Sequence, residues 1–176
     1  MPSTIGPSIA NPASITRSFG QHMLKDVPAE KAARFATPGG VKVVSNHPVF
    51  VFGHLSLYNR RVLALLNMPE GVAAVPAEWD GLFKAGVECK DDPDGTIYPA
   101  LSVVTKKFFE GFDAAVAAVK TADDALLLEP NPMEGRMKEM CPVKAQMITF
   151  VLNAHPMSHF GQISAWRRMI GLGSAM

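Results

Sequence analysis

Apolar side chains recur at helical spacing along three long segments of the chain, at residues 46–67, 100–121 and about 143–170. Within each segment they return every three or four positions, which places them on one face of an α-helix and does not fit the alternation of a strand. We therefore predict three long helices, each with one face turned to a core. The positions on these faces are Phe50, His54, Leu57, Tyr58, Arg61 and Leu65, then Val104, Phe108, Phe112 and Val116, and finally Ile148, Val151, Leu152, His155, His159, Ile163, Trp166 and Ile170.

A fourth helix is predicted near the N-terminus. Asn11 followed by Pro12 is typical of an N-cap residue and the first helical position, and it opens a segment that runs to about Lys25. Residues 1–11, which are rich in Pro, Ser and Asn, are expected to be a flexible tail. Residues 12–176 are expected to form a single domain, because a chain of 176 residues suffices for one core but hardly for two.

The remaining segments read as short helices and irregular connections. Residues 28–35 and 76–85 are predicted to be short helices, and residues 88–99 a polar loop with Asp-Pro and Asp-Gly turn signals. Residues 41–45 have strand composition, but a single strand without a partner is unstable, so we expect an extended connector. The fold class predicted from these elements is all-α, a four-helix bundle with additional short helices.

Composition and charge exclude several functional classes. The formal net charge of +1 gives no field that attracts nucleic acid or anionic lipid, and no apolar run approaches the ~18–20 residues of a membrane span. The N-terminus has no secretory signal pattern. Cys89 and Cys141 lack the spacing of a disulfide framework or a thiolate zinc site, so reduced thiols are expected. These features indicate a soluble cytoplasmic protein.

Two histidines on the inward face of the last predicted helix require an explanation. His155 and His159 are four positions apart, so their rings lie on one side of a helix and can meet one ion at about 2.0–2.1 Å. The plain alternative is a hydrogen bond from each ring to a carbonyl or hydroxyl group. Pro156 stands where a zinc protease of the H-E-x-x-H type has its glutamate, which argues against that class. We expect one long helix, kinked near Leu152–Pro156, with both histidines facing the core.

A metal site of this kind needs a third ligand. His22 lies near the end of the weak first helix, and His47, like Asn46, is placed to cap the helix that follows it. His54 is the remaining histidine, and its position on an inward face resembles that of the pair. We therefore choose His54 as the third ligand. Three neutral imidazoles leave coordination positions open for water or substrate, which is typical of catalytic rather than structural metal sites.

The motifs around these histidines resemble those of the DinB superfamily of metal-binding helical bundles. The stretches "NHPVFVFGHLSLYNRRVLALL" and "HPMSHFGQISAWRRMIGL" contain Gly53-His54-Leu55 and the pattern H-x-x-x-H-x-x-Q that ends at Gln162. The segment from Gly161-Gln162 through Arg167-Arg168 to Gly171 is similar as well. The superfamily is related to mycothiol-dependent maleylpyruvate isomerase and to bacillithiol transferases. Pro156 departs from its usual polar residue after the first histidine.

The resemblance implies a bundle of up-down-down-up topology, a divalent ion (zinc or nickel) held by His54, His155 and His159, and a homodimer. It also implies a small-molecule substrate and a low-molecular-weight thiol. Gln162, Arg61 and Tyr58 are then candidates for contact with the substrate or with the ligands. Their plain alternatives are a hydrogen bond to a bundle carbonyl for Gln162, an ion pair for Arg61 and a core position for Tyr58. Trp166 is expected in the core, and Arg167 and Arg168 are expected to pair with acidic residues or the chain terminus.

The leading functional hypothesis is a metal-dependent enzyme that activates water or a small thiol for transfer or hydrolysis on a small molecule. The alternative is a non-enzymatic metal-binding or stress-associated bundle protein, whose ion ties helices together. A copper-handling role for the ten methionines is weaker, because these residues are spread along the chain.

Overall fold

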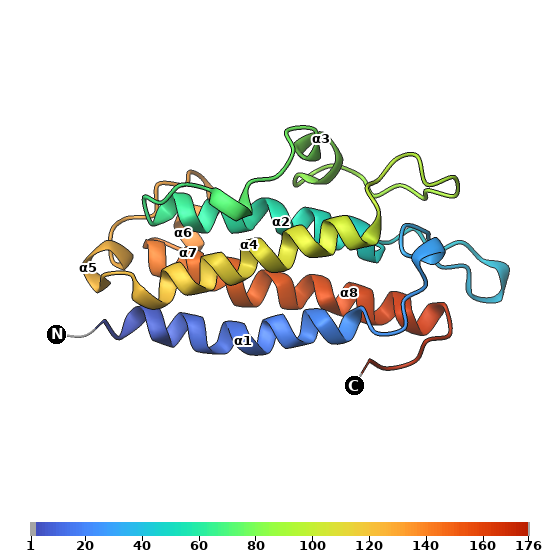
Figure 1. Ribbon diagram of the computed structural model, residues 1–176, viewed down its shortest axis with the longest axis horizontal. Coiled ribbons are helices and arrows are strands. Elements are labelled where there is room, and N and C mark those ends of the chain that lie inside the picture. The colour runs from blue at the N-terminus through green and yellow to red at the C-terminus, as the bar shows by residue number, and fades with distance from the viewer. Residues whose placement is uncertain (1–2, 176) are drawn as a thin grey trace.

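The computed structural model describes residues 3–175 and consists of helices and their connections. Four long helical runs pack side by side (Figure 1), and no strand is present in the described part of the chain. The all-α prediction is thereby confirmed. The helices are α1 (Ile5–Met23), α2 (Pro48–Leu65), α3 (Trp79–Phe83), α4 (Leu101–Thr121), α5 (Asp124–Leu127), α6 (Arg136–Met140), α7 (Lys144–Thr149) and α8 (His155–Met169). Single 3-10 turns lie at Ala29–Lys31, Pro38–Gly40 and Gly71–Ala73.

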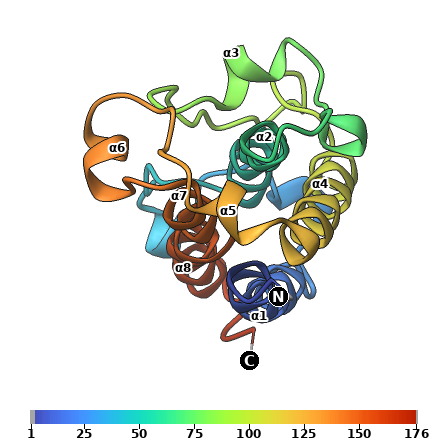
Figure 2. The ribbon, with the colours of Figure 1, turned by 90° about the vertical axis from the view of Figure 1, so that its left-hand side faces the viewer.

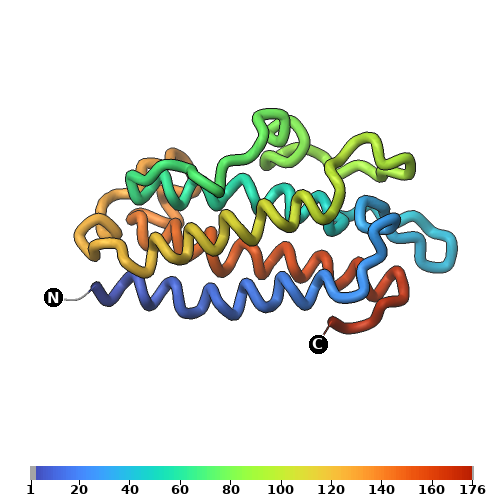
Figure 3. Tube along the Cα trace, in the orientation of Figure 1, coloured from blue at the N-terminus to red at the C-terminus, as the bar shows by residue number. Residues whose placement is uncertain are grey.

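The long helices follow an up-down-down-up course. In Figure 1, α1 and the α7–α8 run point one way, and α2 and α4 point the other. Viewed from one end (Figure 2), the order around the bundle is α1, α4, α2 and α8, so α2 packs between α4 and α8. Because α2 and α4 are parallel neighbours, the chain must cross back along the bundle between them. This crossover, residues 66–100, contains α3 and covers the outer side of α2 (Figure 3).

The crossover explains why α2 is buried almost all round. Fifteen of its residues are buried, including polar ones, although its sequence shows a clear inward stripe. The helix is capped by His47, as predicted: the Nδ1 atom of His47 accepts a hydrogen bond from the Phe50 amide at 3.1 Å, and its Nε2 atom donates to the Lys90 carbonyl at 3.0 Å. Pro48 occupies the first helical position, where its missing N–H leaves no bond unmade. The crossover therefore helps to fix where α2 begins.

The first helix begins at Ile5, seven positions earlier than predicted, and Pro12 lies inside it. The Asp124 carboxylate accepts hydrogen bonds from the Ile5 amide at 3.0 Å and the Thr4 amide at 3.1 Å, so it caps α1 from a distant part of the sequence. Local sequence could not reveal this cap, and the helical boundary at Pro12 is wrong. Residues 1 and 2 of the predicted tail lie outside the described part of the chain.

The smaller predictions are confirmed in part. The helix predicted at 28–35 is only the 3-10 turn Ala29–Lys31, and the helix predicted at 76–85 is the shorter α3. Residues 88–99 form the expected loop, in which the Asp92 carboxylate accepts bonds from three following backbone amides. Residues 41–45 are extended, with one isolated bridge between Ala36 and Val43.

The last helical run continues without interruption from Lys144 to Met169. Its middle segment, Phe150–Ala154, is a π-helical turn, in which the His155 amide donates to the carbonyl of Phe150, five positions back. Such a turn is wider than an α-turn and relieves the contact between a proline ring and the carbonyl four positions before it. The prediction of one long helix through Pro156 is confirmed, and a π-turn lies where the kink was expected.

Two further observations concern the last helix and the surface. Trp166 is fully buried, as expected. Arg167 does not pair with an acid in the described residues: its guanidinium donates to the Met23 and Lys25 carbonyls and so caps the end of α1. Arg168 donates to the Ser164 hydroxyl at 2.8 Å. Within the described residues, bonds to neutral oxygens therefore take the place of the expected ion pairs with acids, and the alternative partner, the chain terminus at Met176, lies outside these residues. No described helix combines the length and the apolar character required to cross a membrane.

Candidate metal centre

His54 lies in the second turn of α2 and is buried. Its Nδ1 atom donates a hydrogen bond to the Phe83 carbonyl, at the end of α3, at 2.7 Å. This bond places the ring proton on Nδ1, so the Nε2 atom carries a free lone pair. Gly53 makes the contact with α3 possible, because a Cβ atom at this position would lie 2.5–2.6 Å from the ring atoms of Phe83.

His159 lies in α8, and its ring is oriented in the same way by a different partner. The Nδ1 atom of His159 is 2.9 Å from the Oε1 atom of Gln162, three positions further along the helix. An amide oxygen can only accept, so Nδ1 is the protonated nitrogen and Nε2 again has a free lone pair. The same Gln162 oxygen accepts a hydrogen bond from the Asn46 side chain at 2.9 Å. This bond links His159 and Gln162 to Asn46, the residue that precedes the N-cap of α2.

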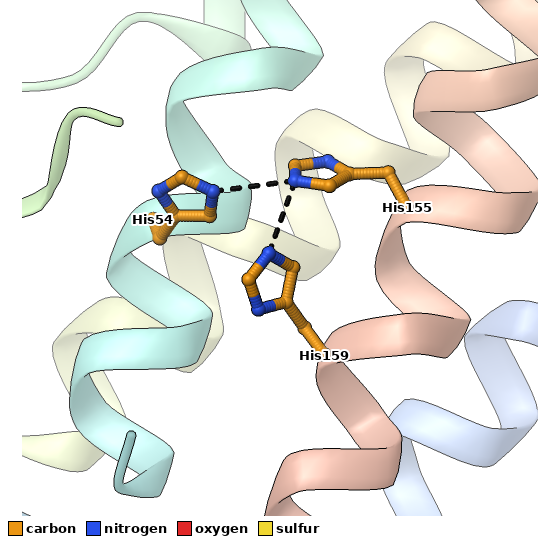
Figure 4. A group of neighbouring side chains, drawn as sticks. All are labelled: His54, His155 and His159. Atoms are coloured by element: carbon orange, nitrogen blue, oxygen red, sulfur yellow. Dashed lines mark hydrogen bonds between the residues drawn. The ribbon is translucent and has the colours of Figure 1, made fainter. Parts of the chain in front are cut away.

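His155 completes the cluster from the first position of α8. Its Nε2 atom lies 3.2 Å from the Nε2 atom of His54 and 3.1 Å from that of His159, so the nitrogens of three rings converge between α2 and α8 (Figure 4). Two aromatic rings pack against it: Phe150 stacks at 5.3 Å between centroids, and Tyr58 meets it edge-on at 4.5 Å. Its Nδ1 atom is buried and has no hydrogen-bond partner.

Hydrogen bonding among the three rings alone cannot satisfy this arrangement. The Nε2 atoms of His54 and His159 are both acceptors, and neutral His155 has one ring proton. If that proton is on Nε2, it serves one neighbour and leaves the other facing a nitrogen, and if it is on Nδ1, three lone pairs point toward one another. A cation between the nitrogens removes the conflict. We therefore conclude that the donor set fits a metal ion.

The spacing of the nitrogens fits as well. A tetrahedral ion with bonds of about 2.0–2.1 Å to nitrogen requires its ligand atoms to be about 3.3 Å apart. Both contacts of the His155 Nε2 atom are near this value, and the three ligand nitrogens all lie within 4.8 Å of one another. The widest separation must shorten when an ion binds, which needs small movements of the imidazole rings.

The electrostatic setting keeps the ligands neutral. Burial lowers the pKa of His54 to about 4 and, together with the nearby His159, lowers the pKa of His155 to about 3. Burial also lowers the pKa of His159, against the bond to Gln162, which favours the charged ring. All three imidazoles are therefore neutral at neutral pH, which is the form that binds metal. No carboxylate or thiol joins the group in the described residues, so a divalent ion here would keep its full positive charge.

The other residues singled out from the sequence lie at different distances from the cluster. Tyr58 contacts the rings of both His54 and His155, at 5.0 and 4.5 Å between centroids. The guanidinium carbon of Arg61 lies over the Tyr58 ring, 4.5 Å from its centroid. His47 is occupied at the cap of α2, and exposed His22 stands outside the cluster.

Three features of the site were not anticipated from the sequence. The Phe83 carbonyl that orients His54 belongs to the backbone, so no residue type could have indicated it. Asn46 was interpreted only as a possible helix cap, whereas its side chain holds Gln162. Phe150 flanks His155 because the π-turn changes the helical register there.

Comparison with known proteins assigns this chain to no family. A scan against protein-family models matched none, and searches of curated proteins and of solved structures gave no significant match. The chain is therefore described by its own geometry, as an all-helical protein with a buried cluster of three histidines that could hold a metal ion.

Proposed function

We propose that this chain is a metal-dependent enzyme of the DinB type, in which His54, His155 and His159 hold a divalent ion, zinc or nickel. The observation that carries the proposal is the convergence of three Nε2 atoms, of which those of His54 and His159 have free lone pairs because the ring protons are engaged at Nδ1. Metal-bound histidines commonly donate their other ring N–H to an oxygen in this way. Imidazole ligands suit both ions, so the donor set leaves the choice between them to measurement.

An ion with three protein ligands retains open positions, at which it would lower the pKa of a bound water or small thiol and supply a nucleophile for transfer or hydrolysis. The other residues of the site orient the metal ligands and surround them. The Phe83 carbonyl and Gln162 fix two of the imidazole rings, which sets the direction of their lone pairs. Phe50 stacks 6.3 Å from His54 and Phe150 stacks 5.3 Å from His155, so each of these two ligands has an apolar ring against it.

The second candidate function is structural. The three histidines come from two helices, so an ion would join α2 to α8, and such a link could serve stability alone. Against this reading, α2 is already fixed by the cap at His47 and by the α3 crossover, and each of two ligands has a separate orienting partner. A site built for stability would also be expected to have a fourth protein ligand.

Removal of the metal distinguishes the two functions. The protein would be unfolded thermally in its zinc-loaded form and after dialysis against a chelator. For an open catalytic site we expect the melting temperature to fall by a few degrees while far-UV circular dichroism at 25 °C is unchanged, because α2 and α8 remain packed by their apolar faces. Loss of cooperative unfolding after chelation, as in small zinc-dependent domains, would establish the structural function instead.

The homodimer is likewise a proposal, drawn from the same resemblance. Multi-angle light scattering on the purified protein tests it, with a mass of twice the 18.9 kDa chain as the expected result. A monomer at micromolar concentration would remove the dimer and leave the metal site as it is, because all three ligands belong to one chain.

A further inference from the structure

Arg61 places a positive charge beside the metal centre. It lies seven residues after His54 on α2, about two helical turns away, and is half-buried. Its guanidinium carbon and the ring centroid of His155 each lie 4.5 Å from the centroid of the Tyr58 ring, so the two are no more than about 9 Å apart. The charge of Arg61 acts on the cluster, since it contributes to the lowered pKa values of His54 and His155.

This cation has no anionic partner in the described part of the chain. Arg17, Arg34 and Arg60 each pair with an aspartate, at 2.6, 2.8 and 2.8 Å, and no such pair involves Arg61. The contrast with Arg60 is sharp, because the two residues are neighbours on one helix and both are half-buried. A partly desolvated cation next to a divalent ion is electrostatically unfavourable unless an anion lies between or beside them.

The geometry of Arg61 leaves its binding edge free. The guanidinium carbon lies over the Tyr58 ring, 4.5 Å from its centroid, and none of the N–H groups of Arg61 has a hydrogen-bond partner in the described residues. This edge matches a carboxylate, which accepts two parallel hydrogen bonds from one guanidinium. A phosphate group would be expected to require further cations, and the neighbouring Arg60 is already paired with Asp80. One unpaired arginine therefore favours a carboxylate.

We infer that Arg61 binds the carboxylate of the substrate, and that the substrate is a short molecule with a metal-binding group at its other end. The inference rests on the proposed function, because it takes the three histidines as the second anchor. The limit of about 9 Å between guanidinium and imidazole restricts the substrate to a few bonds between its carboxylate and its metal-binding atom. The Tyr58 ring contacts both the guanidinium of Arg61 and the imidazole of His155, and it thereby positions the arginine relative to the metal ligands.

The test uses cobalt(II) as a spectroscopic ion and a pair of matched probes, 3-mercaptopropionate and its amide, under anaerobic conditions. The thiolate of both probes bonds to the ion and gives a charge-transfer band, and only the first probe carries a carboxylate. Titration of each probe into the cobalt protein yields two dissociation constants. For the wild type we expect the acid to bind about tenfold or more tightly than the amide, as a charge-assisted bidentate contact implies.

The variants Arg61→Met and Arg60→Met separate the two neighbours. We expect Arg61→Met to bind acid and amide equally while holding the same amount of cobalt, and Arg60→Met to keep the wild-type preference. If Arg61→Met and the wild type both hold cobalt and prefer the acid to the amide by the same factor, the carboxylate site is overturned. The metal centre is not affected by that result. A wild type that binds no cobalt would instead overturn the proposed function, and this is measured before any probe is added.

Discussion

At the scale of single residues, the orientation of each imidazole ring is the feature that separates this cluster from three histidines that merely share a core. Two of the rings direct a lone pair inward because their other nitrogen donates to a fixed oxygen, the Phe83 carbonyl for His54 and the Gln162 side chain for His159. The third, His155, has no hydrogen-bond partner at its Nδ1 atom, and aromatic rings pack against its imidazole. The role of Gln162 is therefore open to a direct test.

Gln162→Leu removes the acceptor of the His159 ring proton, and we expect the affinity for zinc to fall about 10- to 100-fold, as losses of such partners do. Gln162→Glu supplies a carboxylate to the same proton and is expected to restore or raise the affinity. Competition with a chromophoric chelator measures both variants. Because Gln162 is exposed, neither change should alter the thermal stability of the metal-free protein much. Equal affinity in the leucine and glutamate variants would show that Gln162 does not orient His159.

At the scale of elements, the sequence predicted those features that depend on side-chain periodicity. The inward faces of α2, α4 and the last helix follow from apolar spacing. The same spacing placed His54 on the core-facing side of α2, and His155 and His159 on the core-facing side of the last helix. The cap of α1 by Asp124 and the contact of His54 with α3 join residues far apart in sequence, and one of them uses a backbone carbonyl. No local pattern encodes such contacts, so they required the structure.

The two glycines of the histidine motifs have different environments, which gives a matched pair of variants. A Cβ atom at Gly53 would meet the buried ring of Phe83 at 2.5–2.6 Å, whereas a Cβ atom at Gly161 would meet nothing within 4 Å. We expect Gly53→Ala to destabilise the protein by about 1–3 kcal/mol and to weaken metal binding, because α3 carries the carbonyl that orients His54. Gly161→Ala, in the interior of α8, should stabilise by up to about 1 kcal/mol.

Urea unfolding and zinc titration of the two glycine variants measure these effects. If Gly53→Ala binds zinc as tightly as the wild type while losing stability, the packing of α3 against α2 matters for the fold and not for the metal centre. If it loses neither, Phe83 moves freely, and the close approach of the two helices has no consequence for His54.

At the scale of the whole molecule, buried neutral histidines link stability to pH. His47 is fully buried, and burial lowers its pKa to about 4, below the usual 6.5 of an unfolded chain. Between these values the unfolded chain takes up a proton that the folded protein does not, so stability is complete above about pH 6.5 and decreases as the pH falls toward 4. His54 and His155 add to the same trend in metal-free protein.

We expect His47→Gln to flatten this pH dependence in the presence of a chelator, with about 1–2 kcal/mol less loss of unfolding free energy between pH 7 and pH 5 than in the wild type. Urea unfolding at several pH values measures it. His22→Gln is the matched control, because this histidine is exposed, and it should reproduce the wild-type slope. An unchanged slope in His47→Gln would mean that His47 is protonated in the folded protein and that its hydrogen bonds are not those of a neutral cap.

The most direct measurement is the metal content of untagged protein, determined by elemental analysis for the wild type, His54→Ala and His22→Ala. We expect one divalent ion per chain in the wild type and in His22→Ala, and less than a tenth of that in His54→Ala, because no further His, Cys, Asp or Glu ligand joins this cluster among residues 3–175 to replace the lost one. Stoichiometric metal that survives in His54→Ala would place the ion elsewhere and contradict the assignment. A wild type that takes up no zinc or nickel would contradict the metal centre itself.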